Sequence, residues 1–86
     1  SNPLSLKTAI LNYDKIKTKN AKKYLILGDM LELGSHSKKL HESLSPVINR
    51  TNIDKVFVRG RKIFHLYNRI SKLKKGSVLK NKILYS

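Results

Sequence analysis

Two short apolar runs, each followed by a glycine, constrain the fold of this chain more than any other feature. Residues 24–27 read Tyr-Leu-Ile-Leu and precede Gly28, and residues 55–58 read Lys-Val-Phe-Val and lie just before Gly60. A run that is apolar on successive positions and too short for a helix is typical of a strand buried on both faces of a parallel sheet. We therefore expect two such strands.

Helical periodicity precedes the first run. Asn2 accepts hydrogen bonds from free amides at a helix start, and Pro3 is tolerated at the first helical position. Apolar residues then recur three and four positions apart as far as Ile16. This spacing predicts an amphipathic helix over residues 3–17.

A second periodic segment separates the two runs. Either Ser35 or Ser37 can cap it, and its apolar residues share one face. Pro46 removes a hydrogen bond and crowds the preceding turn, so we expect a kink or a break near Ser45.

The third periodic segment spans residues 63–73, and Gly76 is expected to turn the chain after it. Residues 83–85 read Ile-Leu-Tyr and resemble a third strand, whereas Val78 and Leu79 form too short a run to assign. Alternating helices and strands indicate an α/β fold with a partial, Rossmann-like open parallel sheet. Because the series opens on a helix with no strand before it, we interpret residues 1–86 as part of a longer α/β domain.

Composition excludes several classes of protein. Eighty-six residues form at most one small domain, and the absence of cysteine excludes disulfides, thiolate nucleophiles and cysteine-ligated zinc. No apolar run is long enough to span a membrane, and no signal-peptide pattern occurs. The expected location is the cytoplasm.

The chain carries 19 Lys and Arg against 5 Asp and Glu, a net charge of +14. Such a charge is typical of small nucleic-acid-binding proteins, and a basic nucleic-acid-binding α/β domain is one hypothesis. The cations are scattered, however, and form no dense block. An ordinary solvated surface explains such scatter equally well.

Polar residues follow the predicted strands, at the sheet edge where ligands of α/β proteins bind. Residues 28–34 contain two glycines together with Asp29 and Glu32, whose carboxylates could receive an ammonium group, a hydroxyl or a metal-bound water. The same acids could instead simply favour the start of a helix. The helix start at Asn2 and the pair of cations in residues 59–61 could bind anions, although a helix cap and a solvated turn are the simpler interpretations.

Other chemistry has no support in the sequence. The three histidines, His36, His41 and His65, lack the spacing of metal ligands, and we predict no metal site. No G-x-x-x-x-G-K-[ST] loop is present to bind a nucleoside triphosphate.

Two motifs resemble the C-terminal domain of the Mur ligase family. Residues 27–34 read LGDMLELG and are continued by Ser37, Leu40 and His41; the opening Asn2-Pro3-x-Ser5-Leu6 resembles a second motif of that family. The first string is typical of the member that adds D-alanyl-D-alanine to UDP-N-acetylmuramoyl-tripeptide. The resemblance weakens after Gly60.

The resemblance implies part of an ATP-dependent amide ligase of cytoplasmic peptidoglycan synthesis, and hence of cell-wall formation, cell shape and division. ATP and magnesium would be bound mainly by a central domain outside these residues, so the chain alone is expected to be inactive. Asn2, Ser5, Asp29 and Glu32 would lie near the substrate. Another member of the superfamily, such as a folylpolyglutamate synthetase-like protein, is an alternative that residues 29–32 disfavour.

Overall fold

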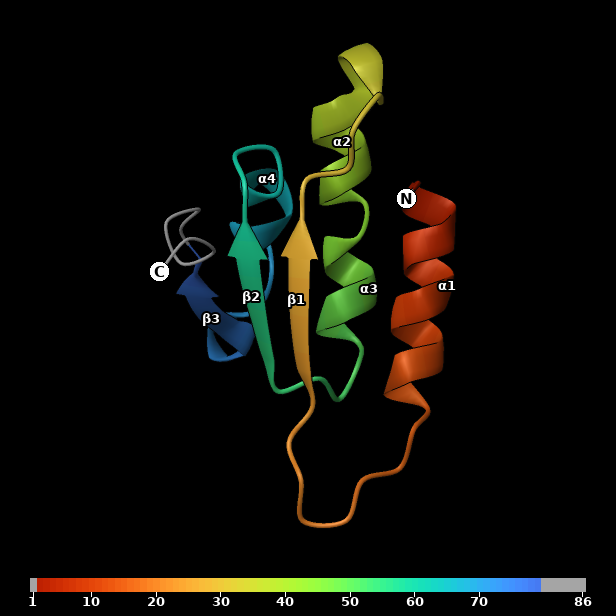
Figure 1. The fold of residues 1–86 in the computed structure, drawn as a ribbon, viewed down its shortest axis with the longest axis vertical. Coiled ribbons are helices and arrows are strands. Elements are labelled where there is room, and N and C mark those ends of the chain that lie inside the picture. Colours follow the sequence, from red (N-terminus) through yellow and green to blue (C-terminus); the bar gives the residue numbers. More distant parts are fainter. Residues whose placement is uncertain (1, 80–86) are drawn as a thin grey trace, which may run out of the picture.

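A computed structural model describes residues 2–79 of the chain. Its centre is a three-stranded parallel sheet in the order β1-β2-β3, formed by Tyr24–Gly28, Lys55–Arg59 and Lys75–Val78 (Figure 1). In the β1–β2 register Ile26 lies beside Phe57. The expected fold class, a partial open parallel sheet with interleaved helices, is confirmed.

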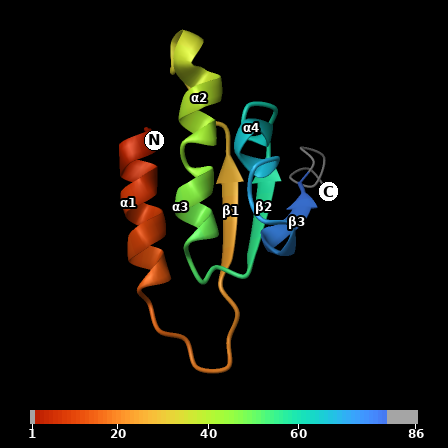
Figure 2. The same cartoon turned by 180° about the vertical axis from the view of Figure 1, so that it is seen from behind.

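Four α-helices and two 3-10 turns connect the strands. Figures 1 and 2, drawn from opposite sides, both place α1 beside α2 and α3, at the side of the molecule far from β3. The bounds are α1 Pro3–Asp14, η1 Gly34–His36, α2 Ser37–Glu42, α3 Ser45–Asn49, α4 Phe64–Tyr67 and η2 Lys72–Lys74.

Helix α1 begins as expected but ends early. The Asn2 side chain accepts a hydrogen bond from the Ser5 N–H at 2.8 Å, which is the predicted cap. The helix ends at Asp14 rather than at residue 17, because the Asp14 carbonyl accepts from Lys23 Nζ at 2.6 Å and its carboxylate accepts from the Asn52 N–H at 2.8 Å. Both bonds tie the end of α1 to the amino ends of the strands.

The second helical segment is broken, as Pro46 indicates. Helix α2 ends at Glu42 and α3 starts at Ser45, with the proline in its first turn. The third segment is shorter than expected: residues 63–73 supply only α4 and η2. Asn49 explains this, because its side chain donates to the Arg69 carbonyl and accepts from the Ser71 N–H, which draws the chain out of the helix.

Strand β3 occupies a position that the sequence did not indicate. Gly76 lies inside this strand instead of turning the chain, and Val78 is its last residue. A Cβ on Gly76 would lie 2.7 Å from the Phe57 ring, so the absence of a side chain lets that ring lie across β3. The strand expected at residues 83–85 lies outside the described residues.

The hydrophobic core lies on one face of the sheet. Leu27, Val56 and Val58 point into it and pack with residues of the helices, including Ile10, Ile48 and Leu66. The opposite face is open, since Tyr24 is 52% and Ile26 70% exposed. The expectation that β1 would be buried on both faces is therefore wrong, because the described helices supply only one covering layer.

No helix within residues 2–79 is long and apolar enough to cross a membrane.

Candidate functional site

The carboxyl ends of β1 and β2 and the start of α1 meet at one end of the molecule. In Figure 1 the tips of both strand arrows and the N label lie toward the same end. Asn2, Asp29 and Glu32, together with Leu31 and Leu33, line an open hollow of about 590 Å³ there. Three of the four predicted site residues are thus brought together from segments far apart in the sequence.

The fourth predicted residue is not part of this hollow. Ser5 is exposed on the first turn of α1, and its backbone N–H donates to the Asn2 side chain. Ser5 therefore holds Asn2 in place through its backbone, and its side chain does not line the hollow.

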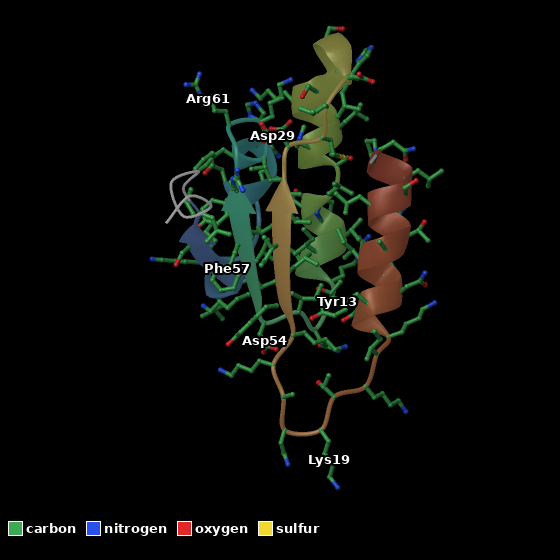
Figure 3. The ribbon with its side chains drawn as sticks, viewed as in Figure 1. Tyr13, Lys19, Asp29, Asp54, Phe57 and Arg61 are labelled. Carbon is green, nitrogen blue, oxygen red and sulfur yellow. The ribbon has the colours of Figure 1, made fainter. Side chains whose placement is uncertain are left out.

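Asp29 joins the ends of the two strands. Its carboxylate accepts from the Ile63 N–H at 2.8 Å and from the Arg61 N–H at 3.3 Å, both in the segment after β2. Figure 3 shows Asp29 and Arg61 at the same end of the sheet. Both carboxylate oxygens are thus engaged by the backbone of the neighbouring loop.

The close packing of Asp29 explains why Gly60 follows β2. Gly60 has a φ of 126°, a region that residues with side chains rarely adopt. A Cβ there would lie 2.3 Å from Asp29 Oδ1. The sequence identified Gly60 only as a strand stop, whereas the structure shows that it makes room for a carboxylate.

These contacts set the charge of Asp29. Burial raises the pKa of its carboxyl, but backbone hydrogen bonds from Ile63, Lys62 and Arg61 lower it by more. The net pKa lies below the ordinary value of 3.8. Asp29 is therefore ionised at neutral pH.

A buried histidine holds the next residue. The Met30 N–H donates to His41 Nε2 at 3.0 Å, and His41 Nδ1 lies 2.7 Å from the Ser37 carbonyl. Because Nε2 accepts, the proton lies on Nδ1 and is donated to that carbonyl. The sequence analysis assigned no role to His41. His41 follows Ser37 by four residues, and this spacing places both on one helical face, so a contact between them could have been predicted from the sequence.

Glu32 differs from Asp29 in its exposure, its backbone conformation and its hydrogen bonding. It is exposed, has a φ of 62°, and makes no hydrogen bond or ion pair within residues 2–79. A non-glycine residue in this conformation costs about 1–3 kcal/mol, and such strain often accompanies function. Of the two predicted carboxylates, only that of Glu32 has no hydrogen-bond partner within residues 2–79.

The opposite end of the sheet also has a hollow, of about 580 Å³, near the end of α1. Its two carboxylates are already paired: Asp54 accepts from the Lys23 N–H at 2.8 Å, and Asp14 accepts from Lys23 and from Asn52. Figure 3 shows Asp54 and Tyr13 toward this end. These contacts fasten the end of α1 to the segments that precede β1 and β2.

No cluster of three or more potential metal ligands occurs within residues 2–79.

Curated proteins similar to this chain include two ligases of the same name. The UDP-N-acetylmuramoyl-tripeptide–D-alanyl-D-alanine ligase of Bacillus subtilis (strain 168) is 39% identical over 61 residues, which cover 71% of this chain and 13% of that ligase. The enzyme of the same name from Rickettsia prowazekii (strain Madrid E) is 37% identical over 76 residues, covering 84% of this chain and 16% of the ligase.

The chain thus spans less than a fifth of the length of these relatives. No protein-family model and no solved structure matches it. The two matches nevertheless confirm the resemblance to the Mur ligase family. By sequence, the chain is related to a short segment of a Mur ligase, UDP-N-acetylmuramoyl-tripeptide–D-alanyl-D-alanine ligase.

Proposed function

We propose that the chain acts as part of an ATP-dependent ligase that joins D-alanyl-D-alanine to UDP-N-acetylmuramoyl-tripeptide in cytoplasmic peptidoglycan synthesis. The observation that carries this proposal is the convergence of Asn2, Asp29 and Glu32 on one hollow. These residues come from the two motifs that resemble the Mur ligases, and they meet at the sheet edge where α/β proteins bind ligands.

The hollow suits the amino component of this reaction. The dipeptide carries an ammonium group, and the unpaired Glu32 carboxylate can receive it through charge-assisted hydrogen bonds. Asp29 holds the loop against the segment after β2, and the Asn2 side-chain amide N–H groups remain able to donate to a carbonyl. Binding the ammonium group there places it at the mouth of the hollow before it loses its proton and attacks.

The same hollow does not fit ATP. Its two carboxylates would repel a triphosphate, and the sequence has no phosphate-binding loop of the G-x-x-x-x-G-K-[ST] type. ATP and magnesium would therefore be bound mainly by a central domain outside these residues. ATP, when bound, supplies the phosphoryl group that activates the tripeptide carboxylate as an acyl phosphate.

A chimeric ligase tests the proposal. In the Bacillus subtilis enzyme, the matching 61-residue segment is replaced by the corresponding residues of this chain. We expect dipeptide-dependent phosphate release within about tenfold of the parent enzyme, whereas the isolated 86-residue chain should give no turnover. A matched control carries a Gly-Ser sequence of equal length in place of residues 29–33. It should lose activity. A chimera that melts cooperatively but forms no amide would contradict the proposal.

A further inference from the structure

The loop that carries Glu32 is bound from within the molecule by helix α2. The His41 side chain, on α2, is fully buried, and its Nε2 accepts a hydrogen bond from the Met30 N–H at 3.0 Å. This bond joins two residues that are 11 positions apart in the sequence. It ties the helix to the start of the loop after β1.

The same helix fixes the orientation of the His41 ring. Nδ1 lies 2.7 Å from the Ser37 carbonyl and 3.3 Å from the Ser37 hydroxyl, one helical turn earlier. An imidazole that donates from Nδ1 presents an unprotonated Nε2 as an acceptor. The ring is therefore held at one nitrogen and offers the other to the loop.

Glu32 lies between two residues that pack inward. The Met30 side chain is 2% exposed and Leu33 packs against the core, whereas Glu32 is exposed. The φ of Glu32, 62°, is sparsely populated by residues other than glycine and persists only where the surrounding structure imposes it. Fixing Met30 and Leu33 thus helps to fix the backbone of Glu32.

Two separate elements hold the start of this loop. The Asp29 carboxylate accepts from the Ile63 N–H in the segment after β2, and the next residue, Met30, is held by α2. An aliphatic side chain in place of His41 could fill the core, but it could not accept from the Met30 N–H. A buried N–H without a partner is costly, so the imidazole serves the loop as well as the packing.

We propose that His41 is a positioning residue for the amide-forming reaction: its Nε2 fixes Met30 and thereby holds Glu32 where its carboxylate lines the hollow. This inference rests on the proposed function, in which Glu32 receives the ammonium group of D-alanyl-D-alanine. His41 is fully buried and does not line the hollow, so it acts only through the loop. A side chain that contacts a ligand is placed accurately only when its neighbours are themselves fixed by packing and hydrogen bonds.

Steady-state kinetics of the chimeric ligase test the proposal. His41→Leu removes the acceptor and keeps the site filled, so we expect the KM for D-alanyl-D-alanine to rise about fivefold. The KM for ATP and kcat should each change by less than about twofold. His41→Gln, whose Oε1 can stand near the position of Nε2 and accept from Met30, should keep the KM for the dipeptide within about twofold of the parent chimera.

Two further variants separate positioning from stability. Val56→Ala removes part of a fully buried side chain near the amino end of β2, outside the hollow. It should lower the melting temperature but leave the KM for the dipeptide unchanged. In a Glu32→Gln background, His41→Leu should raise this KM by less than about twofold more, because the group that it positions has already lost its charge.

The outcomes distinguish this inference from the proposed function. If Glu32→Gln raises the KM for the dipeptide but His41→Leu does not, or if their effects multiply in the double variant, the positioning role is wrong while the proposed function stands. If Glu32→Gln has no effect, the proposed function fails and this inference fails with it. An equal rise in Val56→Ala, or a rise in His41→Gln as large as in His41→Leu, would also overturn the positioning role. Should His41→Leu not melt cooperatively, His41→Asn, whose amide is too short to reach Met30, replaces it with the same expected rise.

Discussion

Gly60→Ala is expected to lower the free energy of unfolding by about 3–5 kcal/mol, an unusually large effect for adding one methyl group. The new Cβ would stand 2.3 Å from Asp29 Oδ1 and force this carboxylate away from the Ile63 N–H. Strain from the positive φ adds about 1–3 kcal/mol, and the unsatisfied N–H adds a similar amount. Urea unfolding followed by circular dichroism measures the loss.

Two controls separate the clash from the backbone strain. Gly34 also has a positive φ, of 60°, but nothing lies within 4 Å of a Cβ there, so Gly34→Ala should cost only about 1 kcal/mol. In an Asp29→Ala background, Gly60→Ala should cost about 1–2 kcal/mol, because the atom that it displaces is gone. Full additivity of the two substitutions would contradict the proposed contact.

Asp29→Ala is expected to cost about 2–3 kcal/mol by itself. It leaves the N–H of Ile63, a fully buried residue, without its partner, while the more exposed N–H of Arg61 can turn to water. Glu32→Ala, which removes the other carboxylate of the loop, should change the free energy of unfolding by less than about 0.5 kcal/mol. A similar loss for both variants would show that Asp29 has no special structural role.

The same carboxylate predicts a pH dependence of stability. The pKa of Asp29 in the folded chain is lower than its ordinary value of 3.8, so the folded state binds fewer protons than the unfolded state at acidic pH. Its contribution is therefore complete well above pH 3.8 and is lost as pH falls through that value and below. Urea unfolding between pH 3 and pH 7 should show a steeper acid loss for the native chain than for Asp29→Asn.

Much of the fold follows from the sequence because its strands and breaks are local signals. The runs at residues 24–27 and 55–58 are strands, Asn2 caps α1, and Pro46 coincides with the break between α2 and α3. The errors have long-range causes. Bonds from Lys23 and Asn52 end α1, and the side chain of Asn49 shortens α4. Periodicity within a segment does not report such contacts.

The sequence predicted which residues of the loop after β1 belong to the candidate site, but it did not predict that Asp29 and Glu32 have different roles. The sequence places Asp29 and Glu32 in one loop after β1, which the structure confirms. It treats them alike, although one carboxylate is held by backbone N–H groups and the other faces the hollow unpaired. This difference depends on the segment after β2, more than 30 residues away in the sequence.

The most direct test of the account measures how Glu32→Gln changes the KM for D-alanyl-D-alanine in the chimeric ligase. A charge-assisted bond to the dipeptide ammonium predicts a rise of about tenfold or more, with the KM for ATP and the melting temperature unchanged. Glu42→Gln, which removes a carboxylate paired with Arg69 away from the hollow, should leave the KM for the dipeptide unaltered. An unchanged KM in the Glu32→Gln chimera would contradict the account.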